Sequence, residues 1–363
     1  MKITFPHMGP TLVYQKLFQL LGHETISPPR PTKRTIDLGV KHSPEFACFP
    51  YKVILGSYLE ALEMGADTVV TSGGSGPCRA GFYGEVHRKT LHSLGYDPEF
   101  IIFDDLKRDP RRFIKNADRL RGANSWPRTF QAVYTAYRLA HAWDGLEKIA
   151  DIRRAYEAKP GSFDRALTEM LRRFEAETET VADVNRIYRE SRAGLAMIPV
   201  AGPGAGFPIR VGIVGEIFVV MEPAINMNLA GVLNRLGCEV VRSMYISEWM
   251  DHNFWPKWFY KSDGALMEKS KPYFAMGIGG HERHNIGNIR IYREQGFDGV
   301  IHLMPFGCLP ELVSQSIMPQ VSRDLQIPVL TLALDEQSGL ANNMTRIEAF
   351  VDLLKNRRGT RTA

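Results

Sequence analysis

Short apolar segments alternate with stretches of helical spacing along much of this chain, and this alternation limits what the chain can fold into. Near the amino end, Lys2–Phe5, Thr68–Thr71 and Phe100–Phe103 are short, apolar and rich in β-branched or aromatic residues, as buried strands are. Between them, Leu12–Leu21 and Tyr51–Met64 carry apolar residues at helical spacing. Strands that alternate with helices predict a parallel sheet with helical crossovers.

The same alternation returns near the carboxyl end, whereas the middle of the chain has no strand signal. The strands expected there are Arg210–Val214, Glu239–Val241, Gly299–Leu303 and Pro328–Leu334. In the middle, apolar residues from Phe163 to Phe174 follow one helical stripe. We therefore expect an α/β fold of two Rossmann-like parallel-sheet lobes with a helical insertion between them. The expected divisions are an N-terminal α/β lobe at 1–105, a helical subdomain and hinge at 106–205, and a C-terminal α/β lobe at 206–363.

The composition is that of a globular protein and excludes a collagen, a coiled coil and a mostly disordered chain. Of the 363 residues, 44% are hydrophobic and 23% are charged. No apolar run approaches the ~20 residues that a helix needs to cross a bilayer. Met1 leads directly into a strand-like segment without the apolar stretch of a signal peptide, so we expect a cytoplasmic protein.

Basic residues gather at 107–121, although the formal net charge of the whole chain is only +5. Seven lysines and arginines stand there against Asp109 and Asp118. A nucleic-acid binder would be expected to show a known module or interleaved aromatic residues, and neither is evident. The run is therefore interpreted as a solvated helix face or as a docking site for an acidic partner protein or a phosphorylated cofactor.

Three of the four cysteines stand in similar surroundings. Cys48, Cys78 and Cys308 each have proline close by, and the last two directly follow expected strands. In open α/β sheets, ligands bind beyond the carboxyl ends of the strands. Cys238 lies instead where a helix meets a strand, and a buried structural thiol is the better interpretation there.

More than one chemistry suits three such thiols. Separations of 30 and 230 residues disfavour a zinc finger or ribbon, whose ligands come in close pairs. A catalytic thiol needs one cysteine and a nearby base, and would not explain three similar loops. A [4Fe–4S] cluster accepts ligands from distant loops, and three cysteines would leave one iron open. From the residues alone, the cluster, unrelated structural thiols and zinc stand as alternatives.

Glycine and proline beside two of these cysteines are expected to face a cofactor. They are Gly76, Pro77 and Gly307. Glycine lets the backbone approach a bulky group, and proline fixes a turn while removing a competing N–H.

Other motifs that suggest known sites are incomplete. Ser72–Gly76 follows a strand, but no Gly-Lys-Ser/Thr follows it, so it is not a phosphate-binding P-loop. The glycines at 202–206 precede a strand, unlike those of the dinucleotide-binding fingerprint. His281 and His284 are three residues apart rather than the four of a helical zinc-protease motif. Thr345–Glu348 has the pattern of a capping box, and we expect it to open the last helix.

Several longer stretches of the chain resemble one family. They are Ala47–Lys52, Gly76–Gly84, Gly215–Glu216, Gly279–Gly287, Phe297–Glu311, Leu334–Gly339 and Thr345–Phe350. In this order they resemble the CoA-enzyme-activase-related branch of the 2-hydroxyacyl-CoA dehydratase/benzoyl-CoA reductase superfamily. The resemblance covers nearly all of the first and third regions, and the helical middle is less diagnostic.

The resemblance implies an iron–sulfur protein in which Cys48, Cys78 and Cys308 hold one [4Fe–4S] cluster at the cleft between the lobes. It also implies a partner, an ATP-hydrolysing activator of the sugar-kinase/actin-like fold that drives single electrons into the recipient at very low potential. The chain has no phosphate loop, so the recipient role fits it better. Family members usually work as dimers, so we expect a homodimer or a heterodimer with a homologous subunit. Neither nucleic acid nor a membrane is expected as a partner.

The reaction that the resemblance implies is electron delivery from the reduced cluster to a bound small molecule or CoA thioester. In the dehydratases, the electron converts a 2-hydroxyacyl thioester to a ketyl radical that expels water. His281, His302 or Glu311 would supply protons or hydrogen bonds near the cluster. The chain is then a dehydratase-like lyase or an ATP-dependent reductase component. The alternatives are a non-catalytic electron-transfer or accessory subunit that does not use CoA thioesters, and a thiol-only binding module.

Overall fold

The computed structural model of the chain describes residues 1–73, 78–103, 109–201, 208–254, 262–274, 276–337 and 339–362. The chain forms two compact units, the first made of Met1–Ala140 and Arg173–Arg186 and the second of His141–Arg172 and Ile187–Ala363. Each unit contains a four-stranded sheet whose pairings are all parallel. The expected α/β class with two Rossmann-like parallel-sheet lobes is confirmed.

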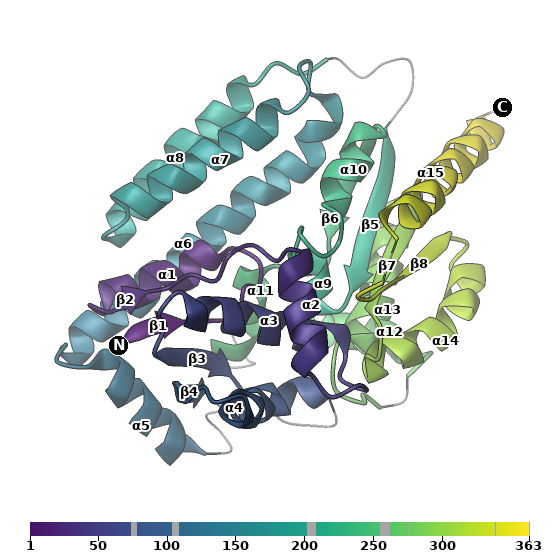
Figure 1. Ribbon diagram of the computed structural model, residues 1–363. Helices are drawn as coiled ribbons and strands as arrows, with labels where there is room; N and C mark the ends of the chain where they lie inside the picture. Colours follow the sequence, from purple (N-terminus) through teal and green to yellow (C-terminus); the bar gives the residue numbers. More distant parts are fainter. Residues whose placement is uncertain are drawn as a thin grey trace. The chain divides into compact units, whose positions relative to one another are not determined.

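The sheet of the first unit has the strand order β2-β1-β3-β4 (Figure 1). Its strands are β1 (Lys2–Thr4), β2 (Glu24–Thr25), β3 (Thr68–Ser72) and β4 (Glu99–Phe103). The helices are α1 (Thr11–Leu20), α2 (Lys33–His42), α3 (Phe49–Glu63), the 3-10 turn η1 (Arg79–Phe82), α4 (Tyr83–Ser93) and α5 (Pro110–Arg121). Ile3, Val70 and Ile101 from neighbouring strands are buried with Phe18 of α1 and Leu120 of α5. The apolar runs that predict the strands therefore form the core.

The second unit has the corresponding strand order, β6-β5-β7-β8. Its strands are β5 (Ile209–Gly215), β6 (Cys238–Arg242), β7 (Gly299–Pro305) and β8 (Val329–Leu334). The helices after β5 are α9 (Ile217–Met221), α10 (Leu229–Arg235), α11 (Ile246–Phe254), α12 (Ser262–Ser270), α13 (Glu282–Glu294), α14 (Leu309–Asp324) and α15 (Leu340–Thr362).

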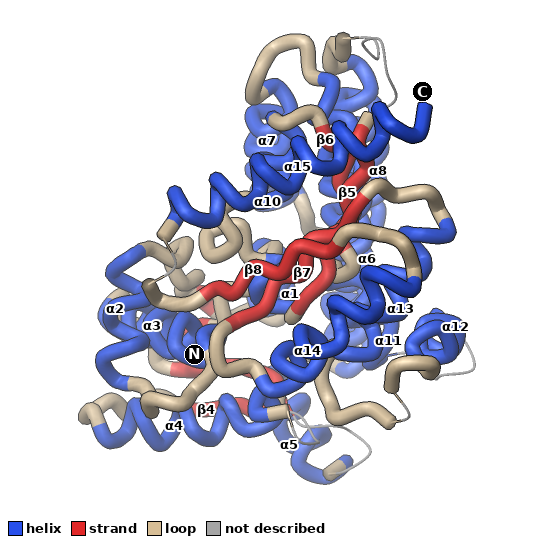
Figure 2. Tube along the Cα trace, turned by 90° about the vertical axis from the view of Figure 1, so that its right-hand side faces the viewer, coloured by secondary structure: helices blue, strands red, loops and turns tan. Residues whose placement is uncertain are grey.

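Strand β7 lies inside this second sheet and is buried along its whole length. Burial on both faces is the reason that such a strand is apolar without alternation. Helices α13 and α14 lie on the same side of the sheet (Figure 2) and share one apolar cluster. Ile289 of α13 and Val321 of α14 pack there with Val300 of β7. This packing brings the amino ends of two helices to the carboxyl end of β7.

Three long helices form the strandless middle of the chain. They are α6 (Trp126–Arg153), α7 (Ser162–Glu177) and α8 (Val181–Met197), and the division between the two units passes through each of them. Phe163 and Phe174, which the helical stripe predicts to be buried, are both 0% exposed. Among the residues that the structure describes, none of the helices has the length and apolarity needed to cross a membrane.

The expected start of the last helix is wrong. Helix α15 begins at Leu340, so Thr345 lies inside it rather than at its N-cap. The Thr345 hydroxyl donates to the carbonyl oxygen of Ala341 at 3.1 Å, one turn back. A threonine followed three residues later by glutamate fits a capping box, but inside a helix the same hydroxyl bonds the carbonyl four residues earlier.

Candidate functional site

Each of the two sheets has a topological switch at its first strand. In the first unit β2 and β3 lie on opposite sides of β1, and in the second β6 and β7 lie on opposite sides of β5. Ligands of open α/β sheets bind at such a switch, beyond the carboxyl ends of the two central strands. Cys78 follows β3, and Cys308 follows β7. These two cysteines therefore hold equivalent positions in the two units.

Each of the three candidate ligands is the N-cap residue of a helical segment. Cys48 precedes α3, Cys78 precedes η1, and Cys308 precedes α14. The backbone is extended at all three residues, and none of the thiols caps its own helix by a hydrogen bond. The partial positive charge at a helix amino end stabilises a thiolate, which is the form of cysteine that binds metal.

The segments around two of these cysteines follow the same pattern. Phe46-Ala-Cys-Phe-Pro50 and Phe306-Gly-Cys-Leu-Pro310 both place phenylalanine two residues before cysteine and proline two residues after it. In both, the proline occupies the first turn of the helix, where its missing N–H costs nothing. The phenylalanines are exposed by 83% and 59%, while the thiols are exposed by only 6% and 7%. This repeated pattern is a sequence signal for the site that cysteine spacing does not reveal.

Direct contacts join the Cys48 and Cys78 segments within the first unit. The Cys48 thiol is hydrogen-bonded to the hydroxyl of Tyr83, the first residue of α4. Arg79, next to Cys78, donates a guanidinium N–H to the carbonyl oxygen of Phe46. Two of the three candidate ligands therefore come from touching segments.

Close backbone contact with α2 fixes helix α3, which presents Cys48. A Cβ atom added at Gly39 would lie 1.8 Å from the carbonyl oxygen of Lys52, and one at Gly56 would lie 1.9 Å from that of Thr35. Only glycine permits this approach. The Thr35 hydroxyl also donates to Oε2 of the buried Glu60 at 2.6 Å. The N-cap of α3 therefore rests on a rigid helix pair.

Cys238 lies apart from the candidate ligands, and of the residues expected to face a cofactor the structure describes Gly307. Cys238 begins β6, is 0% exposed, and burial raises the pKa of its thiol to about 12, as expected of a structural thiol. Gly307 has a φ of +75°, a left-handed conformation directly before Cys308. Gly76 and Pro77 lie outside the described residues.

Two of the residues expected to handle protons are in direct contact. His302 of β7 and Glu311 in the first turn of α14 are each 0% exposed, and Nε2 lies 2.6 Å from Oε2. Asn285 of α13 donates to the same carboxylate oxygen at 2.8 Å and accepts the N–H of Gly215 at 2.9 Å. On the other side of the ring, Nδ1 lies 3.2 Å from the hydroxyl oxygen of Thr331. A continuous hydrogen-bonded chain therefore crosses β7, β8, α13 and α14.

Glu216 at the carboxyl end of β5 adds a second acid to this region. It is the N-cap of α9, where its carboxylate accepts the N–H of Val219 at 3.2 Å. Burial raises the pKa of Glu216 to about 7, the backbone hydrogen bonds oppose the rise, and the charge of Glu311 adds to it. An acid with such a pKa exchanges protons readily near neutral pH.

The third residue expected to handle protons, His281, is the N-cap of α13. Its carbonyl oxygen accepts the N–H of Asn285 at 2.8 Å, and its ring centroid lies 5.8 Å from that of His284. His281 therefore lies one helical turn before the asparagine that bonds Glu311. Periodicity and spacing do not single out Asn285, because its role depends on contacts with β5 and α14.

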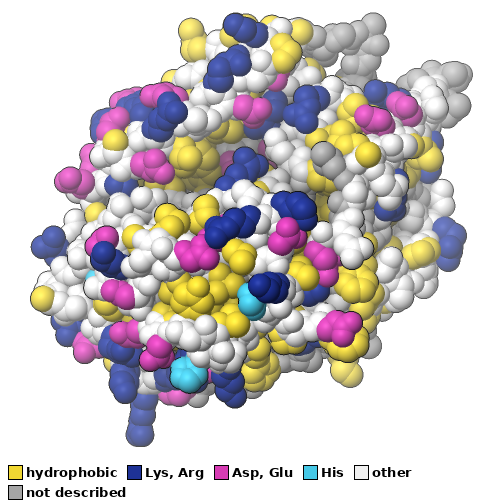
Figure 3. Space-filling model, in the orientation of Figure 1, with side chains coloured by type: hydrophobic (Ala, Val, Ile, Leu, Met, Phe, Trp, Pro, Cys, Tyr) yellow, Lys and Arg dark blue, Asp and Glu magenta, His cyan; other side chains and the backbone are white. Residues whose placement is uncertain are grey.

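The basic run at 107–121 forms α5, except for Lys107 and Arg108, which lie outside the described residues. Arg112 and Arg119 form ion pairs with glutamates of α4 and β4. Figure 3 shows basic and acidic side chains interspersed over one face of the molecule. Part of the positive charge of α5 is therefore neutralised locally.

Within either unit, in the parts of the chain described, no three Cys, His, Asp or Glu side chains gather as a metal site. Cys48 and Cys78 belong to the first unit, and Cys308 belongs to the second.

No protein-family model matches the chain, and no curated protein matches it. Function is therefore inferred from the residues and their geometry.

Proposed function

We propose that the chain is an iron–sulfur protein of the 2-hydroxyacyl-CoA dehydratase/benzoyl-CoA reductase superfamily, and that Cys48, Cys78 and Cys308 bind one [4Fe–4S] cluster. The observation that carries the proposal is the equivalent placement of Cys78 and Cys308, each after the third strand of its sheet. Strand ends at a topological switch are where α/β folds bind ligands.

The donor chemistry of the three residues fits this cluster. Thiolates are its usual ligands, and each of these thiols stands at a helix amino end, where the thiolate form is favoured. The low exposure of Cys48 and Cys308 would shield the sulfur atoms from water, which tunes a cluster's potential. Three protein ligands would leave one iron open to substrate, and the cluster when bound supplies single electrons.

The residues around Cys308 suit the handling of protons. Removal of a hydroxyl group from a substrate requires a proton donor. His302 and Glu311 lie in the strand and helix that flank Cys308, and Glu216 lies at the end of the neighbouring strand. We assign proton storage to these three side chains.

The proposed partner is an ATP-hydrolysing activator of the sugar-kinase/actin-like fold that supplies the electrons. Arg111 and Lys115 of α5 are exposed, and none of the ion pairs among the described residues includes them. They are the cations on which an acidic activator surface would dock. We also propose that the chain forms a dimer and that it works in the reducing cytoplasm, where its thiols stay reduced.

A non-catalytic electron-transfer subunit is the alternative. It is favoured by the complete burial of His302 and Glu311, since neither side chain reaches solvent in this conformation. Turnover of a 2-hydroxyacyl-CoA thioester by the purified chain with its activator and ATP would support the enzyme, and cluster reduction without turnover would support the subunit.

The deciding experiment is anaerobic purification followed by iron and acid-labile sulfide analysis. We expect about four irons per chain. Cys48→Ser, Cys78→Ser and Cys308→Ser should each lose most of the iron. Cys238→Ser is the matched control, and it should retain the iron because this buried thiol begins a strand. Wild-type protein without labile sulfide, or equal iron loss in the Cys238 variant, would refute the proposal.

A further inference from the structure

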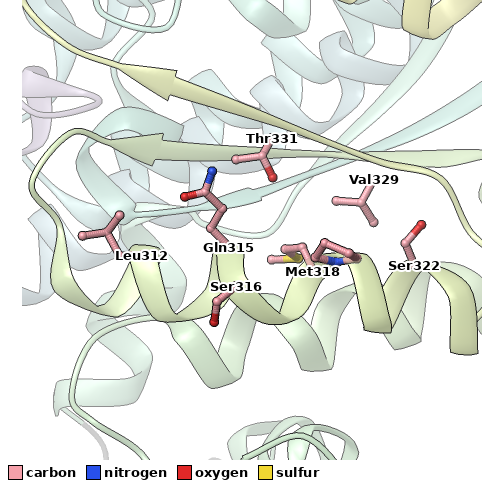
Figure 4. A pocket seen from close by; sticks show the side chains of 8 residues that line it. Leu312, Gln315, Ser316, Met318, Ser322, Val329 and Thr331 are labelled. Carbon is pink, nitrogen blue, oxygen red and sulfur yellow. The ribbon is translucent and has the colours of Figure 1, made fainter.

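A pocket of about 700 Å³ lies between α14 and the edge strand β8. Figure 4 shows the side chains of Gln315 and Thr331 facing the space between this helix and this strand. Side chains of Ser316 and Ser322 also line the pocket, together with apolar groups. Pro319 inside α14 has no N–H, so the Gln315 carbonyl loses its usual helical donor. These polar groups make the pocket suitable for water.

Thr331 connects this pocket to the buried histidine. Its side chain is half-buried and lines the pocket, and its hydroxyl oxygen lies 3.2 Å from Nδ1 of His302. The other ring nitrogen, Nε2, lies 2.6 Å from Oε2 of Glu311. The imidazole of His302 therefore connects Thr331, in the wall of the pocket, with the buried carboxylate of Glu311.

The direction of these hydrogen bonds follows from their chemistry. An ionised carboxylate only accepts, and Oε2 of Glu311 already accepts from Asn285. We therefore assign the neutral ring's proton to Nε2, so that Nδ1 accepts from the Thr331 hydroxyl. The other carboxylate oxygen, Oε1 of Glu311, is buried and has no hydrogen-bond partner among the described residues.

We propose that Thr331, His302 and Glu311 form a proton relay from this pocket to the first turn of α14. The Thr331 hydroxyl gives its proton to Nδ1, and the ring releases its Nε2 proton to Oε2 of Glu311. A proton from pocket water restores the hydroxyl. One proton thus moves from solvent to Glu311, and the neutral carboxylic acid holds it. Proton transfer in the opposite direction returns the His302 ring to the tautomer with its proton on Nε2.

Two further carboxylates lie at helix starts of the same unit. Glu216 stands before α9, and Glu282, which is 2% exposed, begins α13. Asn285 is the polar but uncharged residue that α13 supplies to Glu311.

The catalytic use of the relay rests on the proposed function, whereas the relay itself belongs to the second unit alone. Glu311 lies three residues after Cys308 in the same helix start. A proton on Glu311 is therefore stored in the first turn of the helix whose N-cap is a proposed cluster ligand.

The test uses the full-length chain without a cluster, labelled with ¹⁵N-histidine. NMR measures the exchange of the His302 ring proton with water and identifies the tautomer. Thr331→Val preserves the shape but removes the hydroxyl, so exchange should slow at least tenfold. Thr331→Ser restores the hydroxyl and should exchange as the wild type does. Gln315→Leu is the control, because it lines the same pocket without bonding His302.

Unchanged exchange in Thr331→Val, or a wild-type proton on Nδ1, would overturn the relay. A second measurement separates this outcome from failure of the proposed function. In reconstituted protein, Thr331→Val should keep its iron and sulfide while substrate turnover falls about tenfold. A chain that binds no cluster would refute the proposed function and leave the NMR result standing. Wild-type turnover in a fully loaded Thr331→Val would refute the catalytic use of the relay.

Discussion

Replacing Asn285 with alanine tests whether the buried hydrogen-bonded chain stabilises the second unit. The Asn285 side chain is 0% exposed and joins two elements, since it donates to Glu311 and accepts from the N–H of Gly215. Loss of a hydrogen bond to a charged group costs about 1.5–3 kcal/mol, and an unsatisfied buried N–H costs about 1–3 kcal/mol. We therefore expect Asn285→Ala to lower the free energy of unfolding by about 4 kcal/mol.

Urea unfolding followed by circular dichroism measures this loss. With a slope of about 3 kcal/mol per molar urea, the midpoint should fall by about 1.3 M at an unchanged slope. Asn288→Ala is the matched control, because Asn288 lies on the same helix and its side-chain amide donates to the carbonyl oxygen of His284 within that helix, at 2.9 Å. The control should change stability by no more than about 0.5 kcal/mol. Equal, small effects of the two substitutions would refute the role assigned to Asn285.

Two further predictions concern buried groups of the second unit. Burial, helped by the charge of Glu147, raises the pKa of Asp144 to about 7, so the folded state holds a proton that the unfolded chain releases. The free energy of unfolding therefore includes the full contribution of this proton below about pH 4, and it falls by about 4 kcal/mol between about pH 4 and pH 7. Asp144→Asn should therefore be more stable than the wild type at pH 8 and equal to it at pH 4, and lower stability at pH 8 would contradict this. Gly215→Ala places a Cβ 2.1 Å from a β7 carbonyl oxygen and should cost several kcal/mol in thermal unfolding, whereas Gly296→Ala, with open space at a φ of +76°, should cost about 1–2 kcal/mol. Similar costs at both glycines would contradict the clash.

Residue types alone were enough to place most strands and several helices. Apolar β-branched runs predict β3, β5 and β7 because burial on both faces of a parallel sheet selects such residues. A similar run predicts β8, although this edge strand is only partly buried. The spacing of apolar residues predicts α1, α3 and α7, and Gly22 follows the C-cap residue of α1 with a φ of +84°. The prolines at 50 and 310 also indicate that helices begin after Cys48 and Cys308.

Some local signals are ambiguous without the fold. The capping-box pattern at Thr345 lies inside α15, because a capping pattern and a hydroxyl bonded one turn back share the same residues. Helix α13 begins within the His281–His284 segment, which the spacing of the two histidines does not show.

Only the tertiary structure decides which distant residues meet. His302 comes from β7, Glu311 from α14, Asn285 from α13 and Thr331 from β8, and their hydrogen bonds join positions 9 to 29 residues apart. Strand order depends in the same way on which helices pack against which face of the sheet. Local residue preferences indicate whether a segment is a strand or a helix, because the backbone conformation of a residue depends largely on its own side chain and on its neighbours in sequence. Contacts between elements depend instead on the joint burial of many side chains, which no single segment specifies.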